Sequence, residues 1–287
     1  MSTTTIVQTV TLPLAPKSFG AVYVLSAEPE AEADRLDGWH QGIRRYIGDK
    51  LTMAPLKNPK RILELGVGSG AWVIEAANTY PEAEVVAVDI SPGPGRPLPS
   101  NATYVQRNIL DPMPWPEASF DVIHCRFILC HVSPEPARCA PRIIALLKPG
   151  GWLLVDDADC RSAYEGNAST VGRCMDVYIN FMTSRDQDPH IGAKLATMLQ
   201  QSNQFDQVHT RTALVPLNPH LVPDPDVRIL TETMLKAYSD AMHGSLSQKL
   251  GPQAPELLKQ WREETSRKSG WKCDQLFTVT WSRKRLY

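Results

Sequence analysis

The chain has 287 residues, 43% of them hydrophobic, and a formal net charge of -1. This length can enclose a full core as one elaborated domain, and the near-neutral charge argues against a nucleic-acid-binding surface. No apolar run approaches the roughly 20 residues that span a bilayer, and residues 1–20 do not resemble a secretory signal. Six cysteines without a C-x-x-C pair or zinc-like spacing predict reduced thiols and a cytoplasmic or nuclear location.

Residues 1–55 are expected to form an N-terminal extension and a covering helix. Residues 1–20 are rich in Thr and Pro, which predicts a poorly ordered segment or a strap over the surface. A helix is predicted from Glu28 to Thr52, because Pro29 and acidic residues open it and apolar side chains recur along one face. We expect this helix to lie across the mouth of the fold that follows.

The stretch from Arg61 to Asp89 organises the rest of the chain. A short apolar run predicts a strand buried on both faces, and three glycines follow at every second position, Gly66, Gly68 and Gly70. Glycine can take positive φ and lets a backbone approach a ligand closely. A helical pattern and a second apolar strand ending on Asp89 come next. Together these elements predict a βαβ nucleotide-binding unit whose final acid binds ribose hydroxyls.

Two ligand classes fit this unit. Gly66, Gly68 and Ala71 also match the dinucleotide pattern G-x-G-x-x-G/A, which is typical of nicotinamide dehydrogenases. Glu64 precedes the first glycine by two residues. An acid at this strand end would face an ammonium group favourably and a pyrophosphate unfavourably. The sequence therefore favours a ligand that carries an ammonium and a ribose but no phosphate.

Seven strands are predicted in all, in an α/β, Rossmann-like, doubly wound sheet that is mostly parallel with an antiparallel closing strand at its edge. The five strands beyond the first two are predicted at 103–106, 122–125, 153–155, 208–217 and 276–281. Amphipathic helices are predicted at 171–182, 189–201, 226–242 and 255–264. The second domain then spans 56–287, with a helical cap over the substrate at about 218–270.

The motifs around the glycine loop resemble those of class I S-adenosylmethionine-dependent methyltransferases. E-x-G-x-G-x-G from Glu64 to Gly70, followed by Asp89, resembles their first two motifs. The run from Pro112 to Cys125 resembles their entry into the fourth strand, and LLKPGGW from Leu146 to Trp152 resembles their turn into the fifth. This resemblance covers about residues 60–215. It implies an enzyme that transfers a methyl group by direct in-line displacement.

A more specific but weaker resemblance points to the fungal LaeA-like methyltransferases. Tyr23 and an E-x-D-R-L-x-x-x-H helix from Glu32 to His40 resemble the signature that precedes their cofactor domain. The stretch that begins at Ser184 resembles another of their segments. The resemblance implies a fungal enzyme that methylates a small secondary metabolite.

The resemblance also implies the cofactor site. S-adenosylmethionine, with S-adenosylhomocysteine as product, is expected to contact Tyr23, Glu64, Leu65, Gly66, Gly68, Gly70, Asp89, Ile90, Asn108, Ile109 and Arg126. Asn108 replaces a common Asp, and its amide oxygen can still accept from the adenine amino group. The guanidinium of Arg126 suits the methionine carboxylate. No metal is expected, because the paired acids of metal-dependent catechol O-methyltransferases need an Asp-Asn pair that this sequence lacks.

Catalytic and substrate-binding candidates follow from topology, because ligands bind outside the carboxyl ends of parallel strands. His131 follows the fourth strand, and the acids 156, 157 and 159 follow the fifth. We expect His131 or Asp157 to act as a general base toward a weakly acidic acceptor. Packing or surface roles remain open for the whole candidate set. The candidates for substrate contact are His40, Met234, Tyr238 and Met242.

Other functions stay open beside methylation of a small molecule. The chain could be a regulatory protein that keeps the fold and acts through protein partners, or a protein methyltransferase. A nucleic-acid acceptor is disfavoured by the near-zero charge and the lack of a basic stripe. We expect a small-molecule substrate, no nucleic acid and no membrane partner, and the acceptor atom (O, N, S or C) stays open.

Overall fold

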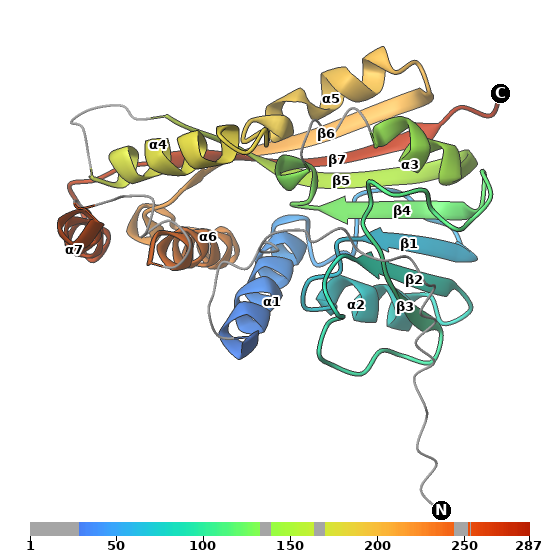
Figure 1. The fold of residues 1–287 in the computed structure, drawn as a ribbon, viewed down its shortest axis with the longest axis horizontal. Helices are drawn as coiled ribbons and strands as arrows, with labels where there is room; N and C mark the ends of the chain where they lie inside the picture. The colour runs from blue at the N-terminus through green and yellow to red at the C-terminus, as the bar shows by residue number, and fades with distance from the viewer. Residues whose placement is uncertain (1–28, 133–138, 164–169, 244–251, 253) are drawn as a thin grey trace, which may run out of the picture.

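The computed structural model describes residues 29–132, 139–163, 170–243, 252 and 254–287 (Figure 1). Tyr23 and the Thr- and Pro-rich segment 1–20 lie outside the described residues. Among the described helices, none is long and apolar enough to cross a membrane.

The strands are β1 (Arg61–Leu65), β2 (Glu84–Asp89), β3 (Ala102–Gln106), β4 (Phe120–Arg126), β5 (Leu147–Ala163), β6 (Phe205–Pro216) and β7 (Asp274–Lys284). The helices are α1 (Pro29–Tyr46), α2 (Ala71–Thr79), α3 (Ala140–Leu146), α4 (Thr170–Thr183), α5 (Ile191–Gln201), α6 (Pro225–His243) and α7 (Ala254–Thr265). Two short 3-10 turns are η1 (Leu129–His131) and η3 (Pro219–Leu221).

The seven strands form one sheet in the order β3-β2-β1-β4-β5-β7-β6. Strands β1 to β5 pair in parallel, and β7 runs antiparallel to both of its neighbours, β5 and β6. The predicted seven-stranded α/β sheet with its antiparallel last strand is thus confirmed. The prediction that this strand closes the edge is wrong, because β7 inserts between β5 and β6 and leaves β6 at the edge.

Strand β5 is much longer than the three residues predicted for it. It runs from Leu147 to Ala163 because β7 pairs with it along most of that length, as far as Ala163 opposite Asp274. The acids at 156, 157 and 159 therefore lie within a strand and not after its end. Neighbouring acids within a strand point to opposite faces of the sheet. Asp156 and Asp157 consequently face different surroundings.

Two apolar clusters cover the faces of the sheet, because successive strand residues alternate between the faces. Ile62 and Val122 join the cluster that contains Trp72 of α2, whereas Leu63 and Ile123 join the cluster that contains residues of α3 and α5. Residues two positions along the same strands share these faces. Glu64 therefore lies on the same face as Ile62, and His124 on the same face as Val122. Glu64 and His124 are paired in the β1–β4 register, so they lie side by side toward α2.

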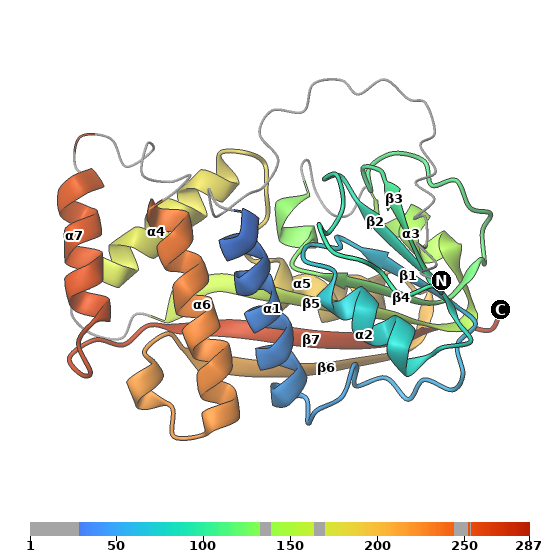
Figure 2. The ribbon, with the colours of Figure 1, turned by 90° about the horizontal axis from the view of Figure 1, so that it is seen from below.

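Helices α1, α4, α6 and α7 gather beyond the carboxyl ends of the parallel strands (Figure 1). Helix α1 lies between α6 and α2 (Figure 2). It approaches α6 closely at Gly42, where a Cβ would come within 2.9 Å of the Cα of Leu230. The helix ends at Tyr46, before the predicted Thr52, because the chain turns through positive φ at Gly48 and Asp49.

All six cysteines are free and buried, as the sequence predicts for reduced core thiols. Four of them lie in or beside the elements that surround the carboxyl ends of β4 and β5, at Cys125, Cys130, Cys139 and Cys160.

Candidate functional site

One cavity of about 590 Å³ lies at the carboxyl ends of the parallel strands, covered by α1 and bordered by α4 and α6. Pockets of a few hundred to a thousand cubic ångströms are typical of small-molecule and cofactor sites. Its polar end is lined by His40, Glu64, Asp89, Asn108, His124 and Arg126. Its apolar end is lined by Ala158, Cys160, Tyr178, Met182, Ala237 and Tyr238.

The glycine loop forms part of the polar end. Gly66 and Gly68 line the cavity and take φ values of 80° and 51°. A Cβ at Gly66 would lie 2.1 Å from Cδ1 of Ile128, so no other residue fits there without a shift of that side chain. Two predicted contacts lie elsewhere: Leu65 is fully buried, and Gly70 caps the start of α2, and neither lines the cavity.

Asp89 and Asn108, which are expected from the sequence to contact ribose and adenine, both line the cavity. The carboxylate of Asp89 accepts from the backbone N of Gly68 at 3.3 Å and from that of Ser91 at 2.9 Å. The amide oxygen of Asn108 accepts from the backbone N of Leu110 at 2.9 Å. Each of these oxygens has further lone pairs for a ligand. Ile90 and Ile109, also predicted, line the cavity beside them.

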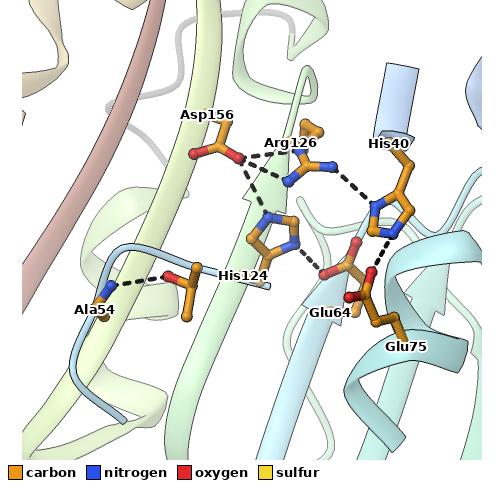
Figure 3. Close-up of polar contacts among 8 residues, drawn as sticks. His40, Ala54, Glu64, Glu75, His124, Arg126 and Asp156 are labelled. Atoms are coloured by element: carbon orange, nitrogen blue, oxygen red, sulfur yellow. Dashed lines mark hydrogen bonds and ion pairs between the residues drawn. The ribbon is translucent and has the colours of Figure 1, made fainter. Parts of the chain in front are cut away.

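A chain of ionisable side chains crosses the polar end from α2 to β5 (Figure 3). Arg126 donates from Nε and Nη2 to Oδ2 of Asp156, both at 3.0 Å, and from Nη1 to Nδ1 of His40 at 3.3 Å. His40 Nε2 lies 2.6 Å from Oε2 of Glu75. On the other side of Asp156, its Oδ2 lies 3.6 Å from Nε2 of His124. His124 bonds in turn, through Nδ1, to Glu64.

The pKa values of the two histidines in this row of side chains are shifted in opposite directions. A guanidinium only donates, so Nδ1 of His40 must accept from Arg126 while Nε2 carries the proton toward Glu75. Burial and the charge of Arg126 lower the pKa of His40 to about 4, against the opposing effect of Glu75. His40 is therefore neutral, with both ring nitrogens held by protein side chains. It lines the polar end of the cavity, where it is bonded to Arg126 and Glu75.

His124 is held between acids instead. Burial lowers the pKa of His124, but Glu64 and Asp156 outweigh burial and raise it above the ordinary value. Burial raises the pKa of Glu64, against the positive charges of His124 and Arg126. For Asp156, burial acts in the same direction but Arg126 and His124 outweigh it and lower the pKa.

The two predicted catalytic residues both line the cavity. Asp157 is fully buried and accepts from the backbone N of Ala158 at 2.9 Å and of Cys130 at 3.3 Å. Burial raises the pKa of Asp157 to about 7. Burial, together with Arg35 and Arg185, lowers the pKa of His131 to about 3. At neutral pH the carboxyl group of Asp157 is the stronger base of the two.

Aromatic and aliphatic side chains form the apolar end. The rings of Tyr178 and Tyr238 pack edge to face with centroids 5.5 Å apart, and the hydroxyl of Tyr238 accepts from Gln275. Of the three residues predicted on α6, only Tyr238 lines the cavity. Met234 and Met242 lie one turn before and after it, are fully buried, and pack in the core. Among the described side chains of α6, Ala237 and Tyr238 line the cavity.

Several cavity residues were not predicted from the sequence. His124 and Trp72 stack with ring centroids 4.0 Å apart and an interplanar angle of 7°. Phe127 takes a φ of 51°, rare for a bulky residue, and packs against Trp39 of α1 at a centroid distance of 4.6 Å. The one available signal was the imidazole of His124 within the apolar run 122–125, two residues before Arg126.

The donors and acceptors of the polar end fit a particular kind of ligand. Asp89 can accept from ribose hydroxyls, Glu64 can face an ammonium group, and Arg126 can face a carboxylate. Two acids beside the glycine loop would repel a phosphate. The set therefore fits a nucleoside joined to an amino acid. Within the described ranges, no group of three or more His, Cys, Asp and Glu side chains is arranged to hold a metal ion.

Comparison with known proteins gives a consistent result. The family model "Methyltransferase domain" matches residues 39–212. The chain is 45% identical to methyltransferase str2 of Strobilurus tenacellus over 222 residues, which cover 77% of this chain and 80% of that protein. It is 32% identical to the secondary metabolism regulator laeA of Aspergillus flavus over 205 residues, 69% of this chain and 54% of that protein.

A solved structure resembles the fold at low sequence identity. It is phosphoethanolamine N-methyltransferase 2 of Haemonchus contortus in complex with S-adenosyl-L-methionine, with a TM-score of 0.50 and 17% identity. The match covers 86% of this chain and 53% of that one, so this chain spans about half the length of that enzyme. The likeness supports the Rossmann-like fold.

Proposed function

This chain belongs to the family of methyltransferase-domain proteins and is an S-adenosylmethionine-dependent methyltransferase, and from that premise we propose that it methylates a small, largely apolar secondary metabolite. The observation that carries this proposal is the division of one cavity into a polar end and an apolar end. The polar end fits the nucleoside and amino acid of the cofactor. The apolar end provides space for an acceptor of low polarity beside it.

The proposed cofactor contacts use the residues of the polar end. Asp89 holds the ribose, Glu64 receives the ammonium group and Arg126 receives the carboxylate, while Asn108 contacts the adenine. When bound, S-adenosylmethionine supplies an already activated methyl group. The protein's task is then to hold the acceptor in line with it, which can lower the barrier by on the order of 7–11 kcal/mol.

Asp157 is the proposed general base. It lines the cavity, and the next residue, Ala158, lines the apolar end. A base is most effective when its pKa lies near the working pH, and burial raises the pKa of Asp157 to about 7. His131 lines the same region, but its lowered pKa of about 3 makes it a weak base. We assign His131 to shaping the cavity, in place of the catalytic role expected from the sequence.

The acceptor contacts come from α4 and α6. Tyr178 and Met182 of α4 and the Ala237–Tyr238 turn of α6 offer aromatic and aliphatic surface. Such a surface favours planar, apolar acceptors. The proposed cap at about 218–270 supplies one wall of this end, and the proposed covering helix within residues 1–55 closes the polar end.

The experiment that tests the function has two stages. Isothermal calorimetry on the purified protein measures binding of S-adenosylmethionine, S-adenosylhomocysteine and NADH. We expect binding of the first two at micromolar concentration and none of NADH. Aromatic and indolic compounds are then screened for transfer of an isotope-labelled methyl group. Binding of NADH, or of neither sulfur compound, would contradict the proposed cofactor.

The similarity to laeA favours a second candidate function. That relative is named a secondary metabolism regulator, so this chain could act on metabolism through protein partners while keeping the cofactor site. One measurement, methyl transfer to small acceptors by the purified protein, distinguishes the two candidate functions. A regulator is expected to bind S-adenosylhomocysteine without methylating any small acceptor, whereas an enzyme of metabolite synthesis transfers labelled methyl groups in the absence of other proteins.

A further inference from the structure

His124 lies on β4 between two buried carboxylates of the neighbouring strands (Figure 3). Its Nδ1 bonds to Oε2 of Glu64, and its Nε2 lies 3.6 Å from Oδ2 of Asp156. A neutral imidazole has one N–H and would turn a bare lone pair toward one of the two acids. The imidazolium carries an N–H toward each acid. It hydrogen-bonds to Glu64 and forms an ion pair with Asp156, because 3.6 Å is too long for a hydrogen bond. The stacked indole of Trp72 covers one face of the ring, so the ring is held in this position.

The other groups around His124 do not supply a positive charge to balance Glu64. Arg126, on the same strand, is paired with Asp156. His40, facing the ring from α1, is neutral because it accepts from Arg126. Glu64 and Asp156 contribute two negative charges, and Arg126 supplies one positive charge. With both carboxylates ionised, the buried set is neutral only when His124 is protonated, and an unbalanced buried charge is strongly unfavourable.

We propose that His124 is a positioning residue that keeps Glu64 ionised and fixed at the edge of the cavity, ready for the ammonium group of the cofactor's amino acid. The inference rests on the proposed cofactor site and goes further, because it assigns a role to a residue that would not itself touch the methyl group. Without the imidazolium, Glu64 and Asp156 would be two buried carboxylates with one guanidinium between them. Glu64 would then take up a proton, since burial already favours its neutral form.

A protonated Glu64 has no net charge with which to attract an ammonium group. The loss should therefore affect ligands that carry the amino acid and spare ligands that lack it. S-adenosylhomocysteine carries both the nucleoside and the amino acid. 5′-Methylthioadenosine carries the nucleoside and the sulfur but no amino acid, and so reports on the rest of the polar end.

The test is the variant His124→Asn, whose amide can donate a hydrogen bond but cannot carry charge. Calorimetry at pH 7 is expected to give a Kd for S-adenosylhomocysteine about 10- to 100-fold above that of the wild type, the range for a lost bond to a charged group. The Kd for 5′-methylthioadenosine is expected to stay within about threefold. Thermal unfolding checks that the variant is folded, and His124→Gln is the substitute if it is not.

Two further measurements separate this role from a purely structural one. In a Glu64→Gln background, His124→Asn should add less than about threefold to the Kd for S-adenosylhomocysteine, because the two residues act as one unit. In His124→Asn alone, affinity relative to the wild type should recover as the pH rises and Glu64 ionises. Additive losses, or a deficit that does not change with pH, would overturn the inference.

The remaining outcomes distinguish the role of His124 from the cofactor site itself. Equal losses for both ligands in His124→Asn would mean general damage to the cavity and would overturn the assigned role. Wild-type affinity for S-adenosylhomocysteine in the variant would overturn it too, while leaving the proposed cofactor site intact. If the wild type itself binds no S-adenosylhomocysteine, the proposed cofactor site fails and the role of His124 fails with it.

Discussion

The two ends of the cavity are built by different means. The polar end consists of strand ends and tight turns, where Glu64, His124 and Asp156 are fixed by sheet register and by one another. The apolar end consists of side chains from α4, α6 and β5 that are held mainly by packing. A charge must find a partner at a defined distance, whereas an apolar wall only needs to fill volume. The polar end is therefore suited to one ligand with defined polar groups, and the apolar end to ligands that match its volume.

The largest expected effect is at the polar end. Gly68→Asp should abolish binding of S-adenosylhomocysteine, raising its Kd more than about 100-fold. The new carboxylate would lie beside Asp89, at a φ of 51° and with its Cβ 3.1 Å from Cδ1 of Leu36. Calorimetry measures the loss.

Gly270→Asp is the matched control for that variant. Gly270 also has a positive φ of 88°, but nothing lies within 4 Å of a Cβ placed there. It should bind like the wild type. If both variants lose binding equally, backbone strain explains the result and the glycine loop is not part of the site.

The next largest effect is expected from Asp157, the proposed general base. Asp157→Asn should lower kcat by about 100-fold or more, because general bases contribute roughly that factor, and should change the Kd of the cofactor little. In the wild type, kcat should rise with pH through about 7, since the carboxyl group must lose its proton before it can accept one. Steady-state rates between pH 5.5 and 8.5 (about two units to either side) cover this transition.

The same buried carboxyl group affects stability with the opposite trend. Its pKa in the folded protein, about 7, exceeds the unfolded value of about 3.9, so folding binds a proton between these limits. Its contribution to stability is full below the unfolded value and is lost as the pH rises toward 7. The difference in free energy of unfolding between Asp157→Asn and the wild type should therefore change with pH in this window. A flat difference in denaturant titrations would show that the carboxyl group titrates normally.

A smaller effect is expected from the apolar end alone. Ala237→Phe adds a ring to the wall formed by α6, where Ala237 is buried but lines the cavity. The KM for the acceptor should rise about tenfold, the scale of a misfit in an apolar pocket, while the Kd for S-adenosylhomocysteine stays unchanged. A loss of cofactor affinity in this variant would break the division of the cavity into independent ends.

The smallest effect is expected from His131→Ala. Its lowered pKa of about 3 means that the imidazole is already neutral at the working pH and binds a proton weakly. We expect kcat to fall less than about tenfold, well below the loss in Asp157→Asn. Initial rates at saturating acceptor decide this. A larger loss in His131→Ala than in Asp157→Asn would transfer the role of base to the histidine.

The polar end was largely predictable from the sequence because its signals are local. Gly66, Gly68 and Asp89 sit at fixed spacings in one βαβ unit, and each spacing reflects a backbone requirement. His124 was not predictable as a site residue. Its role depends on the register that pairs it with Glu64, sixty residues earlier, and on the length of β5 that brings Asp156 beside it.

The apolar end could not be predicted to the same extent. The sequence indicates that α6 is amphipathic, but it does not say which turn of the helix faces the cavity. Tyr238 lines the cavity while Met234 and Met242, on the same stripe, face the core. The position of β7 was also missed, because an alternating pattern can belong to an edge strand or an inner one.

The insertion of β7 between β5 and β6 has a consequence for how the protein is made. During synthesis, β5 and β6 leave the ribosome before the strand that joins them, and chains emerge at about 5–20 residues per second. Until residues 274–284 appear, both strands have an open hydrogen-bonding edge. Phe277, which packs against Phe127 beneath the cavity, arrives in the same strand. The nascent chain can therefore assemble its glycine loop early, but it cannot complete the surroundings of the cavity until β7 has been synthesised.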